Sequence, residues 1–332
     1  MSAIMSGCPR PVVFIARGVP PSGAARLREV CDVIEWEGPG RIPQDTFVER
    51  VGQCKPNAVL IHPPDRVDRQ LLDSAGPQLK VVGTMSVGLD HVDLEECRRR
   101  GVAVGYTPNV LTSAVAEHAV GLILGAARKY KPGMRAIHSS VWGTRWDNAL
   151  WMAGKEIGGS VVGIVGLGRI GIAVAKRLKS FDPARIIYCG SGPKDDAKQV
   201  GAEFVPFEEL LKHADFVIAT CSINEGNKGL FNKGVFDKMK TSSIFVNVSR
   251  GVLVNQEDLH KALTTGVIGG AALDVTSPEP LPADHPLLSL DNCLVIPHLG
   301  SATDTTRNRM CNLTVSNILA GLKGETLPSS AL

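Results

Sequence analysis

The sequence has no long hydrophobic run and no concentrated charge of one sign. None of its apolar stretches reaches the roughly 20 residues that a membrane-spanning helix needs. The formal net charge is only +3, and the most basic segment, CRRRG at 97–101, is typical of the solvated end of a helix. We therefore expect a protein that binds neither a membrane nor a nucleic acid.

Paired cysteines and targeting signals are also lacking. The eight cysteines are scattered, without a C-x-x-C pair or zinc spacing, which favours a reducing compartment and gives no reason to expect a metal. The first ten residues have neither the apolar core of a signal peptide nor the arginine-rich face of a transit helix. The C-terminal SAL lacks the basic middle residue of a peroxisomal signal. We expect a cytoplasmic protein.

Residues 161–171, VVGIVGLGRIG, contain the most informative pattern that is present. Branched apolar residues predict a buried strand, and IAVAKRLKSF after the glycines predicts a helix. In that setting Gly166 permits a tight turn, Gly168 lets the backbone approach a pyrophosphate, and Gly171 lets helix and strand pack closely. The helix N-terminus and Arg169 can bind the phosphates. A plain glycine-rich turn is the alternative, but the flanking strand and helix favour a dinucleotide site.

The first third of the chain alternates β-rich runs with helical stretches such as 21–31 and 93–100, which favours a parallel, doubly wound sheet. A helix at 114–128 is apolar on nearly every face, which predicts burial between lobes or subunits rather than a place on the surface. The strands are predicted at 11–17, 32–36, 57–63, 80–86 and 102–107.

The glycine motif opens a second alternating series, so the predicted fold class is α/β with two doubly wound parallel sheets. The proline-rich segment 276–286 cannot be regular structure, and 302–323 predicts one long helix that crosses the first sheet. Further strands are predicted at 184–190, 215–222, 243–249, 267–275 and 292–297, and helices at 207–213, 232–239 and 256–264.

Three of the four tryptophans, Trp142, Trp146 and Trp151, lie in residues 138–154. Large aromatic residues gathered in a loop usually anchor an interface, so contact between two copies of the chain is the first interpretation. Lining a substrate pocket is the alternative.

Arg250, Glu279 and His298 each follow a predicted strand of the second sheet, where ligands of such sheets bind. Reduction of a 2-keto acid needs these groups: a guanidinium that binds the carboxylate and polarises the carbonyl, and an imidazole that gives the carbonyl oxygen its proton. A carboxylate on the other ring nitrogen holds the imidazole and favours its protonated form. Each residue alone also fits an ordinary surface or loop role, but three at one sheet edge favour catalysis.

The end of the second strand of this sheet bears on cofactor choice. An NAD site normally has Asp or Glu there for the ribose 2′-hydroxyl, whereas this strand continues into Ser191-Gly192-Pro193-Lys194. A hydroxyl and an ammonium can bind a 2′-phosphate. We predict NADPH as the preferred cofactor, with NADH possible because Asp195 and Asp196 follow closely.

Several longer motifs resemble the D-2-hydroxyacid dehydrogenases, and most narrowly their glyoxylate reductase/hydroxypyruvate reductase group. The likeness covers nearly the whole chain, and DVTSPEPLPADHPLL points to the narrower group. The motifs are TMSVGLDH (84–91), VGYTPNVLT (104–112), GIVGLGRIG (163–171), FVNVSRG (245–251), VNQEDLHKAL (254–263), LDVTSPEPLP (273–282) and PHLGSAT (297–303).

The resemblance implies two domains: a flavodoxin-like substrate domain, 1–108 plus 302–332, and a Rossmann cofactor domain, 109–301. It also implies a homodimer, with a dimerisation segment at 112–154 and a tryptophan that reaches the partner's active site. It implies that Arg250, Glu279 and His298 are catalytic. Substrate binding is implied for Val87, Gly88, Arg250, His298 and Ser301, and cofactor binding for Gly166, Leu167, Gly168, Arg169, Ile170, Gly171, Ser191, Lys194, Ser222, Val248, Asp274 and Gly300.

The implied activity is NADPH-dependent reduction of hydroxypyruvate to D-glycerate and of glyoxylate to glycolate. One alternative is a sibling enzyme for another 2-keto acid such as phosphohydroxypyruvate, which would need more cationic groups than the sequence near Val87 offers. Another is a dinucleotide-sensing scaffold of the same fold. The related NADP enzymes often have arginine near position 191, which is serine here.

Overall fold

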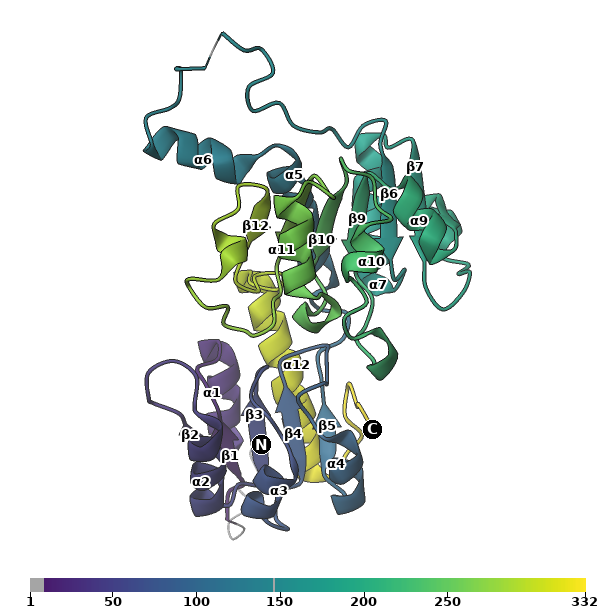
Figure 1. Cartoon of the computed structure of the whole chain (residues 1–332). Helices are drawn as coiled ribbons and strands as arrows, with labels where there is room; N and C mark the ends of the chain where they lie inside the picture. The colour runs from purple at the N-terminus through teal and green to yellow at the C-terminus, as the bar shows by residue number, and fades with distance from the viewer. Residues whose placement is uncertain (1–8, 146) are drawn as a thin grey trace. The chain divides into compact units, whose positions relative to one another are not determined.

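The computed structural model describes residues 9–145 and 147–332, which form two compact units (Figure 1). Unit 1 comprises the described residues up to Leu111 together with Thr303–Leu332, and unit 2 is Thr112–Ala302. Trp146 lies outside the described residues. The domain boundaries expected at 108 and 302 stay a prediction, because a compact unit is not by itself an independently folding domain.

Unit 1 contains a five-stranded sheet in the order β2-β1-β3-β4-β5, and every pair of neighbours is parallel. The central strands are buried on both faces, as their unbroken apolar runs predict. All five predicted strands are present. They are β1 (Val12–Ile15), β2 (Asp32–Glu35), β3 (Ala58–Ile61), β4 (Val81–Thr84) and β5 (Ala103–Gly105).

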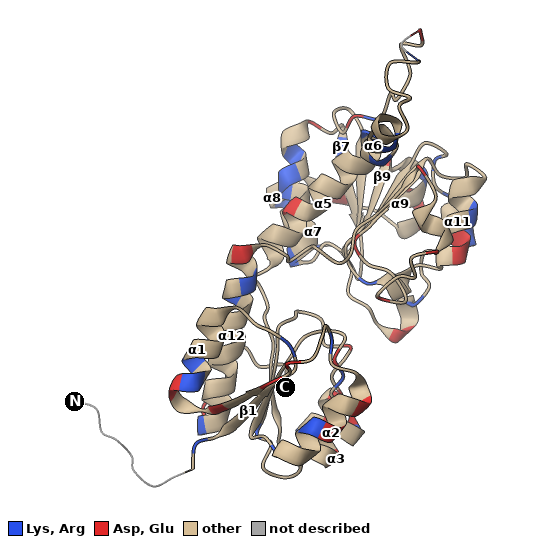
Figure 2. Ribbon diagram, turned by 90° about the vertical axis from the view of Figure 1, so that its left-hand side faces the viewer, with Lys and Arg blue, Asp and Glu red and all other residues tan. Residues whose placement is uncertain are grey.

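Helices cover both faces of this sheet: α1 and α12 lie on one face, and α2 and α3 on the other (Figure 2). The long helix α12 packs on β3, β4 and β5, where a side chain at Gly83 would come within 2.8 Å of Thr314 and Ile318. Glycine there permits close helix packing. The helices are α1 (Pro21–Val30), α2 (Gln44–Cys54), α3 (Arg69–Ala75), α4 (Leu94–Arg100) and α12 (Asp304–Lys323).

Unit 2 contains a seven-stranded sheet in the order β12-β11-β10-β9-β6-β7-β8, again parallel throughout. The two doubly wound sheets confirm the predicted fold class. The short strand β8 was not predicted, since its three residues show little pattern. The strands are β6 (Val161–Val165), β7 (Arg185–Cys189), β8 (Ala202–Phe204), β9 (Phe216–Ala219), β10 (Ile244–Asn247), β11 (Gly270–Leu273) and β12 (Cys293–Val295).

The predicted apolar helix, α5 (Thr112–Ala127), packs within unit 2 against α7 and against β10, β11 and β12. These contacts bury one of its faces, and burial between lobes or subunits stays a prediction. Figure 2 shows α5 and α7 on one face of this sheet and α9 and α11 on the other. The other helices are α6 (Tyr130–His138), α7 (Arg169–Leu178), α8 (Ala197–Val200), α9 (Phe207–His213), α10 (Lys233–Phe236) and α11 (Gln256–Thr264), with 3-10 turns at Lys179–Phe181, Glu225–Asn227, Gly251–Leu253 and Pro286–Leu288.

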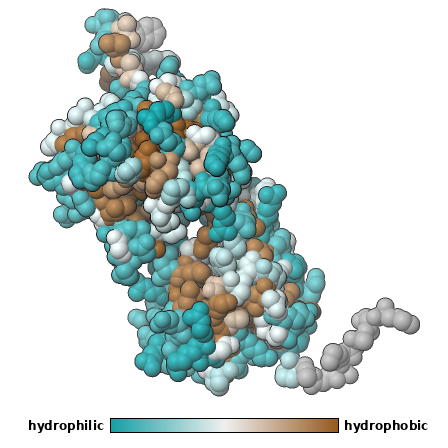
Figure 3. Space-filling view, turned by 90° about the vertical axis from the view of Figure 1, so that its right-hand side faces the viewer, coloured by the Kyte–Doolittle hydropathy of each residue, from teal (hydrophilic) through white to brown (hydrophobic). Residues whose placement is uncertain are grey.

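The surface of unit 2 includes a projection formed by α6 and residues 139–145 and 147–152 (Figure 1). Figure 3 shows hydrophilic and hydrophobic residues mixed on it. Large side chains exposed there are Tyr130, Met134, Ile137, Trp142 and Leu150. The first three are three and four residues apart and therefore share one face of α6.

No described helix combines the length and the apolarity needed to cross a membrane. The seven described cysteines are free thiols, and five of them are buried, as expected of core residues.

Candidate active site

The turn after β6 has the steric features that a dinucleotide-binding loop requires. Gly166 has φ +97°, and a side chain there would come within 2.5 Å of the Cys221 backbone. A side chain at Gly171 would collide with the Gly166 carbonyl oxygen. Both positions therefore need glycine, one for the turn and one for helix packing.

Gly168 differs from the other two glycines because nothing lies within 4 Å of a side chain placed there. It is the N-cap of α7, and no side chain caps the helix. Gly168 and Arg169 are exposed. Open space over uncapped backbone N–H groups fits the phosphates of a dinucleotide, and it gives the predicted cofactor residues of this loop a physical basis.

Arg250 follows β10 on a loop that approaches the loop after β11. A side chain at Gly251 would collide with the Thr276 carbonyl oxygen, so only glycine permits this approach. The fully buried Asn247 side chain fixes the turn, since its amide donates to the Arg250 carbonyl at 2.9 Å and its oxygen accepts from Ser249 N–H at 3.0 Å. The Arg250 guanidinium donates to the Ser249 carbonyl.

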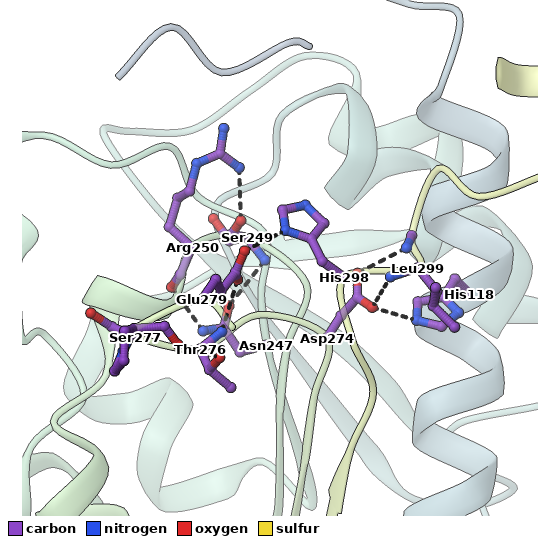
Figure 4. Close-up of polar contacts among 12 residues, drawn as sticks. His118, Asn247, Ser249, Arg250, Asp274, Thr276, Ser277, Glu279, His298 and Leu299 are labelled. Atoms are coloured by element: carbon purple, nitrogen blue, oxygen red, sulfur yellow. Dashed lines mark hydrogen bonds and ion pairs between the residues drawn. The ribbon is translucent and has the colours of Figure 1, made fainter. Parts of the chain in front are cut away.

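Glu279 and His298 are brought together across two loops. The His298 Nδ1 lies 2.8 Å from Glu279 Oε2, and Glu279 Oε1 accepts the Thr276 N–H at 3.0 Å (Figure 4). With Nδ1 held by a carboxylate, Nε2 is the ring nitrogen that remains to exchange a proton with a ligand. The two side chains are 45% and 35% exposed, so they are accessible to a small molecule.

Figure 4 shows Arg250 and His298 on either side of Glu279, at the carboxyl ends of the strands. The structure thus brings together the three residues predicted to be catalytic. A guanidinium beside a carboxylate-backed imidazole can bind a carboxylate and deliver a proton within one small site.

Asp274 holds the turn that carries His298. Its buried carboxylate accepts the Leu299 N–H at 2.7 Å and the Gly300 N–H at 2.9 Å, and it lies 2.9 Å from the Nε2 of His118 on α5. The Asp274 carbonyl accepts the His298 N–H. His298 itself has φ +54°, a conformation that needs such support.

Asp274 was predicted as a cofactor-lining residue, but its partner His118 was not predicted. A lone histidine on an apolar helix gives no signal by itself, because its partner is 156 residues away. The supporting roles of Asn247, Gly251 and Thr276 were likewise missed. Their motifs were recognised, but not the contacts between the two loops.

The other predicted site residues follow strand ends in both units. In unit 1, Val87 and Gly88 follow β4, where the Ser86 hydroxyl donates to the Gly88 carbonyl at 2.8 Å. The remaining residues follow the ends of β6, β7, β9, β10 and β12 in unit 2: Leu167, Ile170, Ser191, Lys194, Ser222, Val248 and Ser301.

Comparisons with known proteins show the family of the chain. The family model of the D-isomer specific 2-hydroxyacid dehydrogenase NAD-binding domain matches residues 120–300. The glyoxylate reductase/hydroxypyruvate reductase of Mus musculus is 46% identical over 320 residues, which cover 96% of this chain and 96% of that protein.

Two solved structures are similar over the whole chain. A protein from Thermus thermophilus has 38% identity and a TM-score of 0.90, covering 97% of this chain and 100% of that one. The NADPH-dependent glyoxylate/hydroxypyruvate reductase of Sinorhizobium meliloti, in complex with NADP and malonate, has 28% identity and a TM-score of 0.81, covering 97% of each chain. The chain therefore belongs to the D-isomer-specific 2-hydroxyacid dehydrogenases, a family of NAD(P)-dependent oxidoreductases.

Proposed function

We propose that this protein reduces hydroxypyruvate to D-glycerate and glyoxylate to glycolate, with NADPH as its preferred cofactor. The observation that carries the proposal is the Glu279–His298 pair beside Arg250 at one sheet edge. The names of the Mus musculus and Sinorhizobium meliloti relatives support the choice of substrates.

In this mechanism Arg250 binds the substrate carboxylate and polarises the neighbouring carbonyl. A dinucleotide whose pyrophosphate is held by the loop of Gly166, Gly168 and Gly171 would supply the hydride from its reduced nicotinamide. His298 donates a proton from Nε2 to the carbonyl oxygen, while Glu279, 2.8 Å from Nδ1, holds the ring in the orientation that this transfer needs. The substrate contacts of Val87, Gly88 and Ser301 are part of the same proposal.

The NADPH preference is supported by the loop after β7. Ser191 and Lys194 are exposed, and the Lys194 N–H donates to the Tyr188 hydroxyl at 2.8 Å, which anchors the loop. Because a lysine anchored there can bind a 2′-phosphate, Lys194→Ala should raise the KM for NADPH about tenfold and leave that for NADH nearly unchanged. Lys198→Ala, an exposed lysine on α8, is the matched control.

The decisive experiment measures steady-state rates of the purified protein with each cofactor on hydroxypyruvate and glyoxylate. We expect a higher kcat/KM with NADPH than with NADH. A protein that turns over neither keto acid would contradict the proposed activity. Equal kcat/KM values for the two cofactors would contradict only the cofactor preference.

We also propose that the protein is a homodimer. The shared face of Tyr130, Met134 and Ile137 is exposed on α6, and a second copy of this projection would cover it. Ile137→Glu should convert the dimer to monomer in sedimentation, whereas Val30→Glu, an exposed position on α1, should not. A wild-type protein that sediments as a monomer would contradict this assignment.

A further inference from the structure

The carboxyl edge of the unit 1 sheet has polar residues that the proposed reaction does not use. In the order β2-β1-β3-β4-β5 the connection reverses direction between β1 and β3, and ligands of such sheets bind at this switch point. Arg17 follows β1 there, and His62 follows β3 directly.

His62 is buried without a partner for its side chain. It is only 9% exposed, and its Nε2 has no hydrogen-bond partner among the described residues. Burial lowers the pKa of His62 to about 3, and the nearby charges of Arg17 and Arg307 act in the same direction. A buried polar atom without a hydrogen-bond partner costs free energy, so a ligand atom at this nitrogen would be stabilising. In the tautomer that carries its proton on Nε2, His62 would donate to an anion.

Positive charge at this edge exceeds the negative charge that compensates it. Asp65, 1% exposed, lies 2.6 Å from Arg17 Nη2 and 3.3 Å from Arg41 Nε, and it also accepts the His62 backbone N–H at 3.2 Å. The single carboxylate of Asp65 thus pairs with the guanidinium groups of both Arg17 and Arg41. The Nε of Arg17 is buried and has no partner among the described residues.

Arg307, in the first turn of α12, adds a third guanidinium. The residue after it, Asn308, accepts the Ser22 hydroxyl at 3.2 Å, so this turn lies beside the start of α1, a few residues after Arg17. Burial lowers the pKa of Arg307, and the positive charge of Arg17 acts in the same direction. Within residues 9–145 and 147–332, Arg307 makes no ion pair or side-chain hydrogen bond. A partly buried cation without a counter-charge is costly, and a bound anion would remove that cost.

We propose that Arg17, His62 and Arg307 form a binding site for a small oxyanion of the phosphate class. The Nε–H of Arg17, the Nε2–H of neutral His62 and the guanidinium of Arg307 are its donors. A water molecule could satisfy one donor but could not balance the surplus charge. The proposal does not depend on hydride transfer, so it stands or falls separately from the proposed function.

The test titrates the full-length protein with inorganic phosphate by calorimetry, at low ionic strength in a buffer without phosphate. Arg307→Gln and His62→Leu should each weaken phosphate binding, Arg307→Gln by about 10- to 100-fold because it removes a charge-assisted contact. Arg309→Gln makes the same charge change at an exposed position of the same helix and should bind like the wild type.

Phosphate could also bind at the glycine loop of unit 2, so Arg169→Gln is measured alongside. Binding that Arg169→Gln abolishes and Arg307→Gln leaves intact would overturn the proposal, as would no binding by the wild type. Thermal unfolding shows that each variant is folded, and phosphate should raise the Tm of the wild type and Arg309→Gln more than that of Arg307→Gln.

A second titration with 2-phosphoglycolate distinguishes the sources of the anion. Tighter binding than inorganic phosphate, with the same sensitivity to Arg307→Gln, identifies an organic phosphate as the ligand. Equal affinity identifies free phosphate. Either result supports the site.

Discussion

Each unit has a histidine that follows a strand of its parallel sheet, but the two histidines differ in exposure and in hydrogen bonding. In unit 2, His298 follows β12, is 45% exposed and is paired with Glu279. In unit 1, His62 follows β3 and is 9% exposed, and its Nε2 has no hydrogen-bond partner in the part of the chain that the structure describes. Both sheets are parallel and doubly wound, so the difference comes from the loops and not from the architecture.

This contrast bears on what the proposed proton transfer requires of a histidine at a strand end. A carboxylate on Nδ1 stabilises the charged ring, and exposure lets a substrate reach Nε2. Burial beside guanidinium groups does the reverse, since it keeps the ring neutral and leaves it suited to donate one hydrogen bond to an anion. The fold supplies the position, and the neighbours decide the chemistry.

The largest expected effect is the loss of the unit 2 histidine. His298→Ala should lower kcat for hydroxypyruvate by about 10²- to 10⁴-fold, because it removes the proposed general acid. The measurement is the steady-state rate of NADPH oxidation. His213→Ala, an exposed histidine on α9, should keep the wild-type rate.

The corresponding variant in unit 1 is His62→Leu, and its kcat is measured in the same assay. It should leave kcat within about threefold of the wild type, a smaller change than the loss of any general acid would cause. If His298→Ala and His62→Leu had the same kcat, the two histidines would not differ in catalytic role. That result would contradict the proposed role of His298.

A smaller effect is expected from Asp274, a positioning residue through its contacts with the backbone after His298. Asp274→Asn replaces one acceptor oxygen by a donor, which then faces a backbone N–H or His118. We expect kcat to fall about 10- to 100-fold as His298 loses its orientation.

Asp215→Asn is the matched control, since Asp215 also accepts a backbone N–H, from Val161 at 2.9 Å, but at the opposite end of the sheet. It should lower the Tm and spare kcat. If Asp274→Asn lowered only the Tm, Asp274 would be a purely structural residue.

Much of this fold was predictable because its signals are local. Unbroken apolar runs predicted the β strands of unit 1, and the helices at 207–213 and 256–264 were predicted with the bounds that α9 and α11 have. The glycine loop was predictable because a side chain at Gly166 or Gly171 would collide with backbone that is close in sequence or follows a neighbouring strand.

The supporting contacts were not predictable, because they join distant segments. Nothing near His118 indicates Asp274, and nothing near His62 indicates that Arg307, on the last helix, lies close to it. A cationic set near Val87 was not predictable for the same reason, since Arg17 and Arg307 come together only through the sheet order and the packing of α12.

The smallest expected effect concerns the stability of unit 1 against pH. Folded His62 stays neutral down to its pKa of about 3, whereas an unfolded histidine binds a proton below about pH 6.5. The unfolded state therefore binds more protons between these values. The wild type should lose about 1.4 kcal/mol of stability for each pH unit below 6.5 from this residue.

His62→Leu removes that proton uptake, so urea unfolding followed by circular dichroism should show a shallower loss of stability on acidification. At pH 5.5 the variant should have gained about 1.4 kcal/mol relative to the wild type, compared with their difference at pH 7.5. His213→Leu should follow the wild-type curve. If the free energy of unfolding fell equally with decreasing pH in His62→Leu and the wild type, His62 would take up its proton in the folded state. Its burial would then not keep the ring neutral, and the difference from His298 would be lost.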